Sequence, residues 1–455
     1  MSAPAAEIPF TTALRTWARI GLESFGGPAG QIAVMHRVLV EEQRWISEGR
    51  FLHALSYCML LPGPEAQQLA TYVGWLLHRT KGGLAAGLLF VLPGFVTILV
   101  LSLLYAAYGN LPIVAAVFFG IKPAVLALVL EALLRISRRA LKHRFHWWIA
   151  AAAFVAIFLL QVPFPLIVLG AGAIGLALQR FVPAFVPENA AATSGSGALA
   201  VVDALLDREI PAHAQPSLAR ALRVVALWGG LWAAPIAFLF ATLGGSHIFT
   251  QIAVFFSKMA VVTFGGAYAV LAYVAQQAVE THGWLAPGEM LDGLGMAETT
   301  PGPLIQVVQF VGFLAAYRQS GTLTPWIAGT LAAVLTTWVT YVPCFLWIFL
   351  GAPYVERLRS NRALRGALAC ITAAIVGVIL NLTVWFSLHV LFGTVRDVRL
   401  GPLFLQVPAW ETVNVAAVAI AVAAAVATLR FHAGIFALLG GSAIAGLLWR
   451  FGLSG

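Results

Sequence analysis

Charged residues are scarce in this chain. Only 10% of its 455 residues are charged, whereas 60% are hydrophobic. Soluble globular domains carry about 25% charged residues, so an ordinary soluble protein is excluded. A surface this apolar needs lipid as its solvent, and the composition therefore predicts a membrane protein.

Cysteine is scarce as well, with three residues at positions 58, 344 and 370. All three lie in apolar segments without the spacing of metal ligands, so we interpret them as small packing residues. The sequence shows no nucleophile–base pair and no nucleotide-binding loop, and we expect neither an enzyme nor a cofactor or metal site. The first residues lack a basic region before an apolar core, so no signal peptide is expected.

Positive charge is abundant by contrast, with a net charge of +9, but its distribution does not suit nucleic acid. A third of the 27 Lys and Arg residues lie in two short loops, at 135–144 and 357–365, which hold Arg135, Arg138, Arg139, Lys142, Arg144, Arg357, Arg359, Arg362 and Arg365. The turns at 108–112, 161–165 and 244–247 carry no Lys or Arg. Basic loops are typical of the cytoplasmic side of a membrane protein, so both loops are predicted to be cytoplasmic.

Long apolar segments predict an all-α polytopic membrane protein. A bilayer-spanning helix needs about 20 apolar residues, and several segments are of this length. The predicted spans are 84–107, 112–134, 147–160 with 165–179, 223–243, 325–350, 366–391, 409–428 and 433–449. The pair at 147–160 and 165–179 is short and predicts a tilted hairpin.

The chain also contains an internal duplication. Ser24-Phe25-Gly26-Gly27 recurs as Thr263-Phe264-Gly265-Gly266, and Leu61-Pro62-Gly63-Pro64 recurs as Thr300-Pro301-Gly302-Pro303. At the same spacing Glu41, Trp45 and Gln67 recur as Glu280, Trp284 and Gln306. Apolar halves that share helix-breaking motifs are the sequence signature of a secondary transporter.

The duplication divides the chain into three parts. We expect an N-terminal repeat over 1–180, a cytoplasmic linker over 181–222 and a C-terminal repeat over 223–455. The extra span at 223–243 would invert the second repeat, which agrees with the cytoplasmic placement of both basic loops. The N-terminus is expected in the cytoplasm, and a homodimer is possible.

The broken helices are the candidate substrate site. Proline and glycine interrupt a helix, and the helix that follows exposes unpaired N–H groups and a partial positive charge suited to an anion. The candidate residues are Gly26, Gly27, Pro62, Gly63, Pro64, Gln67, Gly265, Gly266, Pro301, Gly302, Pro303 and Gln306. Hinges or packing points are the alternative interpretation, and the sequence leaves open whether the Gly-Gly breaks are re-entrant tips or interrupted spans.

Charges inside the apolar sequence support the same interpretation. Arg19 and Lys258 occupy equivalent positions seven residues before Gly26 and Gly265, and Lys122 lies within a predicted span. These cations could offset the charge of an anionic substrate, or they could extend to the membrane surface. The candidate carboxylates for proton coupling are Glu65, Glu298 and Glu23, for which internal ion pairs are the alternative.

These motifs resemble the chromate ion transporter family in its long two-domain form. The resemblance rests on Phe25-Gly26-Gly27-Pro28, Trp45, the segments 61–70, 91–94 and 120–124, and their second-half counterparts at 263–266 and 300–303. It implies a bacterial inner-membrane protein that exports chromate, driven by the proton gradient, and confers chromate resistance. A carrier or exchanger of sulfate or another oxyanion is the main alternative. A passive anion channel is disfavoured by the duplication.

Overall fold

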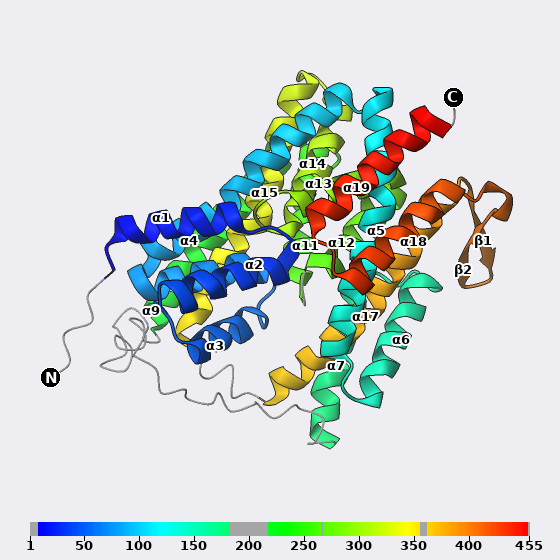
Figure 1. The fold of residues 1–455 in the computed structure, drawn as a ribbon. Coiled ribbons are helices and arrows are strands. Elements are labelled where there is room, and N and C mark those ends of the chain that lie inside the picture. The colour runs from blue at the N-terminus through cyan, green and yellow to red at the C-terminus, as the bar shows by residue number, and fades with distance from the viewer. Residues whose placement is uncertain (1–7, 182–216, 265–266, 355–361, 454–455) are drawn as a thin grey trace.

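The computed structural model describes residues 8–181, 217–264, 267–354 and 362–453 (Figure 1). Within them, six helices are long and apolar enough to cross a membrane. Helices dominate the fold, which confirms the prediction of an all-α polytopic membrane protein. Most of the predicted linker lies outside the described residues, as do Gly265 and Gly266.

The two repeats contain the same elements in the same order. The first repeat comprises α1 (Phe10–Glu23), α2 (Gly27–His36), η1 (Arg37–Glu42), α3 (Glu48–Cys58), α4 (Glu65–Tyr108), α5 (Pro112–Ala140), α6 (Arg144–Phe158) and α7 (Phe164–Phe181). The second comprises α11 (Ile248–Val262), α12 (Ala267–Gln276), η5 (Gln277–Thr281), α13 (Pro287–Thr299), η6 (Leu304–Gln306), α14 (Val307–Arg318), α15 (Pro325–Gly351), η7 (Ala352–Tyr354), α17 (Arg362–Leu391), α18 (Val415–Phe431) and α19 (Ile435–Leu448). Even the π-helical turns η1 and η5 correspond. Additional elements are α9 (Leu218–Val224), η4 (Val225–Gly229) and α10 (Gly230–Leu243) between the repeats, and η9 (Trp449–Leu453) at the end.

Local sequence explains where these helices start. The Ser47 side chain accepts a hydrogen bond from the Arg50 N–H and caps α3, while α5, α13 and α15 each have a proline in the first turn. Proline suits this position because the first N–H groups of a helix have no intrahelical partner.

Each glycine- or proline-rich break is the tip of a helical hairpin. The rings of Tyr57 in α3 and Tyr72 in α4 are 5.3 Å apart, although a straight helix would separate them by about 22 Å. In the second repeat Gly293 in α13 packs against Phe310 in α14. The Pro-Gly-Pro breaks are therefore reversals of the chain.

The hairpins of the Gly-Gly breaks show the same reversal. Phe255 in α11 lies 5.7 Å from Tyr273 in α12, between ring centroids. In the first repeat the Arg37 guanidinium, at the start of η1, contacts the Glu23 carboxylate at the end of α1. We call residues 24–27 and 263–266 the Gly-Gly tips, and residues 61–64 and 300–303 the Pro-Gly-Pro tips.

Helix α4 is itself a hairpin. His78 and Arg79 have non-helical backbone angles, and Gly74 packs directly against Gly82 on the returning arm. The first arm is a short helix that starts at a Pro-Gly-Pro tip, and the second arm contains the predicted span 84–107. Helices α14 and α15 form the equivalent pair in the second repeat, with the turn at 319–324.

The repeats exchange their last two helices. Helices α6 and α7 of the first repeat pack on α17 of the second, and α18 and α19 of the second repeat pack on α5 of the first. Figure 1 shows α6 and α7 beside α17 on one side of the molecule, and α19 running over α5. A pseudo-twofold axis between the repeats would produce this exchange. Their inverted orientation in a membrane stays a prediction.

A small β-hairpin is the feature that the sequence did not predict. Strands β1 (Val395–Leu400) and β2 (Leu403–Pro408) pair antiparallel between α17 and α18, followed by the turn η8 (Trp410–Thr412). The hairpin is largely exposed and projects from the helices (Figure 1).

Candidate functional site

The hairpin tips of the two repeats meet. The Gly63 N–H donates to the Thr263 carbonyl at 2.8 Å, and the Gly302 N–H donates to the Ser24 carbonyl at 2.9 Å. These two bonds are equivalent under the duplication, because each joins the Pro-Gly-Pro tip of one repeat to the Gly-Gly tip of the other. The structure thus brings together breaks that lie far apart in the sequence.

Further contacts join the two Gly-Gly tips and the two Pro-Gly-Pro tips into one cluster. A Cβ added at Gly27 would lie 3.5 Å from the Tyr268 hydroxyl and 3.8 Å from the Leu304 side chain. The Gln31 amide donates to the Gly302 carbonyl at 2.7 Å. Gly63 and Pro64 in one repeat, and Gly302 and Pro303 in the other, are buried. These four tip residues therefore lie inside the protein, where both repeats contribute to one cluster.

Two further residues of the site were not predicted from the sequence in this role. Gly94 in α4 packs against Gly302, and Cys344 in α15 packs against Gly63. Each follows a proline inside a helix, at Pro93 and Pro343. Gly94 and Cys344 are 250 residues apart, whereas the tips repeat every 239 residues, so a search at constant spacing does not pair them.

Buried amide side chains lie directly behind the Pro-Gly-Pro tips. Gln67 and Gln306, the repeated glutamines, are at most 1% exposed. Gln68 and Gln309 join them and were not predicted; Gln68 donates to the Pro62 carbonyl at 2.7 Å, and Gln309 accepts from Gln306. Within the described residues the buried Oε1 atoms of Gln67, Gln68 and Gln306 have no hydrogen-bond partner. Unpaired buried polar groups are costly in an apolar interior, which is consistent with a binding function for this layer.

One of the predicted carboxylates is linked to the tips. Glu298, which is 3% exposed, accepts a hydrogen bond of 2.5 Å from Tyr268, the residue that faces Gly27. Glu65 is half-buried and is the first residue of α4, where the positive end of the helix favours a carboxylate. Neither has an acidic counterpart, because Met59 and Leu304 occupy the equivalent positions. The two halves of the site are therefore not identical in charge.

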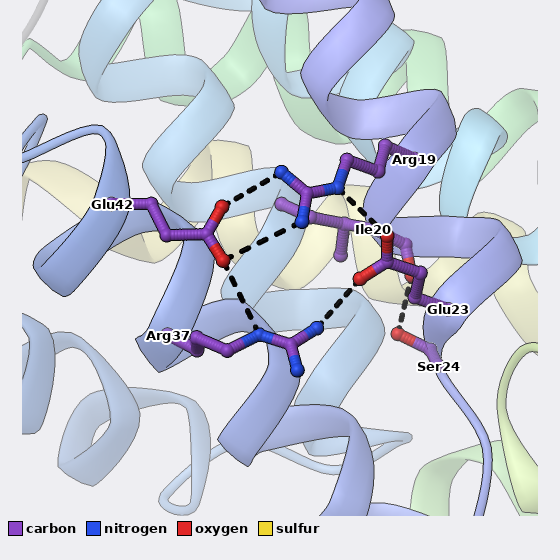
Figure 2. A network of polar contacts seen from close by, with 6 residues as sticks. All are labelled: Arg19, Ile20, Glu23, Ser24, Arg37 and Glu42. Carbon is purple, nitrogen blue, oxygen red and sulfur yellow. Dashed lines mark hydrogen bonds and ion pairs between the residues drawn. The ribbon is translucent and has the colours of Figure 1, made fainter.

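Arg19 lies in a network of ion pairs (Figure 2). Its guanidinium contacts Glu23 and Glu42 at 2.7 Å each, and Arg37 contacts Glu23 at 2.6 Å. These side chains are between about a third and a half exposed. Glu23, a predicted coupling residue, thus pairs with two arginines and helps to join α1 to η1.

Lys258, the counterpart of Arg19, is exposed on α11 and makes no ion pair with any residue that the structure describes. Seven residues separate each cation from its Gly-Gly tip, or about 10 Å along a helix. Both cations therefore lie about two helical turns from a Gly-Gly tip. Only Arg19 has its charge offset by neighbouring carboxylates.

Lys122 has a partner that the sequence did not reveal. Its ammonium lies 3.4 Å from Asp292 Oδ2, and the Tyr105 hydroxyl donates to the same oxygen at 2.8 Å. Asp292 is eight residues before Thr300 on α13, about 12 Å from the Pro-Gly-Pro tip. Lys122 thus lies away from the tips, in an ion pair that joins the two repeats.

The site offers backbone N–H groups, amides and cations for an anion. No cluster of three or more metal-binding side chains occurs in the part of the chain that the structure describes. Helix ends and flexible glycine backbone suit a ligand recognised by several hydrogen bonds at once, such as an oxyanion.

Comparison with known proteins decides the family. The chromate transporter family matches residues 11–176 and 250–447, which cover both repeats. The chain belongs to the chromate transporter family. The match leaves out residues 177–249, which lie between the two matched segments.

Relatives from several organisms are similar over most of their length. A chromate transport protein of Pseudomonas aeruginosa is 33% identical over 365 residues, covering 79% of this chain and 77% of that protein. A probable chromate transport protein of Synechococcus elongatus is 28% identical, covering 79% and 80%. A chromate transport protein of Cupriavidus metallidurans is 26% identical, covering 79% and 78%. No solved structure matches this chain.

Proposed function

We propose that this protein is a secondary transporter that exports chromate from the cytoplasm and binds the oxyanion where the four tips meet. Family membership supports chromate as the substrate. The reciprocal hydrogen bonds between Gly63 and Thr263 and between Gly302 and Ser24 are the observation that carries the binding site, because they bring both repeats to one place. The protein would lie in a bacterial inner membrane with its N-terminus in the cytoplasm.

The tip cluster fits the chemistry of a tetrahedral dianion. Removing such an ion from water is costly unless several aligned donors and positive charges replace the lost hydration. The Pro-Gly-Pro tips place the first turns of α4 and η6, with their unpaired N–H groups, in the cluster. Because Glu65 occupies the start of α4, the start of η6 is the more favourable end for a dianion. Lys258 is the stronger of the two equivalent cations, since Arg19 is already paired.

Two driving forces can be separated by experiment. Moving one charge through a membrane potential of 100 mV changes its free energy by about 2.3 kcal/mol. The free energy of a dianion therefore falls by about 4.6 kcal/mol when it leaves a negative interior. This corresponds to a concentration ratio of roughly a thousandfold. The proton gradient is the second force that we propose, and Glu298 is its strongest candidate because its partner Tyr268 contacts a tip.

The function is tested with purified protein in liposomes. Labelled chromate uptake is measured under an imposed membrane potential, under an imposed pH gradient and with both, with sulfate as the competing oxyanion. We expect saturable chromate transport that responds to both forces. Flux that ignores the pH gradient would remove proton coupling, and a clear preference for sulfate would remove chromate as the main substrate.

A further inference from the structure

The ion pair between Lys122 and Asp292 joins the two repeats. Lys122 belongs to α5 of the first repeat and Asp292 to α13 of the second. Among the described residues, every other ion pair lies within one repeat. The cations of these pairs are Arg19, His36, Arg37 and Arg135 in the first repeat, and Arg318 and Arg396 in the second. A transporter built from two repeats works by moving structural units against each other. A charge pair across the repeats is therefore placed where it would break and re-form.

The pair is not duplicated. The tip spacing of 239 places His53 at the position equivalent to Asp292. Gly446 of α19 contacts Gly120 of α5 as Gly175 of α7 contacts Gly366 of α17, so Gly120 corresponds to Gly366 and α5 aligns with α17 at a spacing of 246. That spacing places Leu368 at the position equivalent to Lys122. The equivalent contact in the other half thus has no fixed charges. The ion pair therefore makes the two otherwise related halves of the transporter different in charge.

Asp292 is incompletely satisfied. Its Oδ2 atom has two partners, Lys122 and Tyr105, but its Oδ1 atom is buried and has no hydrogen-bond partner in the described structure. The side chain is 4% exposed, whereas that of Lys122 is 28% exposed. The cation is therefore the accessible member, and its removal would leave a buried carboxylate uncompensated.

The location of the ammonium favours a negative partner. An added Cβ at Gly288 would lie 2.9 Å from Lys122 Nζ, so the ammonium reaches the first turn of α13. A helix start has partial positive charge and disfavours a cation there unless an anion is close. At present the Asp292 carboxylate, one turn further along, supplies that negative charge. A passing oxyanion could supply it instead.

We propose that Asp292 is the counter-ion of Lys122 when no substrate is bound. An oxyanion that moves between the tips and the first turn of α13 displaces the Asp292 carboxylate and pairs with the Lys122 ammonium instead. The inference rests on the proposed function and assigns a positioning role to Asp292. When the oxyanion takes Lys122, the Asp292 carboxylate loses its cation and takes up a proton from water. The charged and titratable groups that face Asp292 are Tyr105 from α4, Lys122 from α5, Arg318 from α14 and Glu289 on α13 itself.

Transport kinetics of Asp292→Asn test this exchange. The variant leaves Lys122 without its competitor, so the KM for chromate should fall by about tenfold, the factor expected from one hydrogen-bonded contact. In the wild type the KM should rise with pH, because the ionised carboxylate competes better. In Asp292→Asn this competition is lost, and the remaining pH dependence reports the titration of chromate itself. Lys122→Gln should raise the KM by about tenfold or more.

A charge swap separates this role from a purely structural tether. In Lys122→Asp/Asp292→Lys the pair can still form, so thermal stability should recover relative to either single variant, but chromate transport should not. Recovery of transport would show that the pair is only a tether and would overturn the inference. An Asp292→Asn variant with the wild-type pH dependence of KM would overturn it as well.

Two further variants complete the experiment. Glu411→Gln removes the exposed pair with Arg396 within the second repeat, and it should leave the KM and its pH dependence within about twofold, because exposed pairs contribute little. Tyr105→Phe is a milder change, usable if Asp292→Asn does not fold. Loss of its O–H donor destabilises the ionised carboxylate, so the midpoint of the KM–pH curve should move to higher pH. An unmoved midpoint contradicts the inference, whereas a wild type that transports no chromate contradicts the proposed function instead.

Discussion

Replacing Gly94 with alanine is a sensitive test of the tip cluster. Gly94 lies inside α4, where alanine is preferred over glycine by about 1 kcal/mol, so the substitution alone should stabilise the helix. Its new Cβ would, however, lie 2.7 Å from the Pro301 carbonyl oxygen at the opposing Pro-Gly-Pro tip. An ordinary contact is at least 3.4 Å, so this backbone atom must move by about 0.7 Å.

The expected cost follows from that displacement. Overpacking of a tight contact costs about 1–3 kcal/mol, which outweighs the gain in helix propensity and leaves a net loss of roughly 1 kcal/mol. Transport should suffer more than stability, because a shift of about 1 Å in a binding geometry can reduce activity by two orders of magnitude. We expect chromate flux to fall by about tenfold or more.

Thermal unfolding in detergent and chromate flux in liposomes measure the two effects separately. Gly170→Ala is the matched control, because Gly170 is also helical, in α7, and a Cβ there has no heavy atom within 4 Å. The control should transport at the wild-type rate. If Gly94→Ala also does so, the tips do not form the tightly packed site that we describe.

Three further predictions concern charge and topology. Lys258→Gln should lower chromate flux by about tenfold or more, since it removes a cation that has no ion pair in the described structure and lies about two helical turns from a tip. Arg19→Gln should change flux less and lower stability by up to about 1 kcal/mol. Equal flux losses in the two variants would contradict this ranking. Glu298→Gln should abolish stimulation by a pH gradient and retain chromate exchange at equal pH, and persistent stimulation would remove Glu298 from proton coupling. Accessibility tags inserted between α5 and α6, at 141–143, and between η7 and α17, at 355–361, should both report the cytoplasm, and tags on opposite sides would contradict the inverted repeats.

The parts of the site that the sequence predicted are those carried by the duplication. Gly63, Gly302 and their proline neighbours recur at a fixed spacing, and a helix break within an apolar segment frees backbone groups that lipid cannot satisfy. Their convergence follows physically, since buried backbone groups at a break need partners, and the tips satisfy each other through Gly63 and Gly302.

The parts that the sequence did not predict depend on contacts between distant segments. Asp292 is 170 residues from Lys122 and has no acidic counterpart in the first repeat, so neither spacing nor symmetry indicates the pair. Cys344 and Gly94 were not paired because the repeats differ in length between the tip and the following proline. The β-hairpin at 395–408 was not expected because its strands are short and partly charged, and they lie between two long apolar helices that dominate the pattern of this region.

The most direct test of the central claim is to locate bound chromate. A structure of the protein with chromate, in which anomalous scattering identifies the chromium atom, would give its position without reference to any other assumption. We predict that the chromium lies among the four tips, within contact distance of residues next to Gly27, Gly63 and Gly302. Chromium bound elsewhere in a transport-competent protein, with the tips closed on each other, would contradict the account.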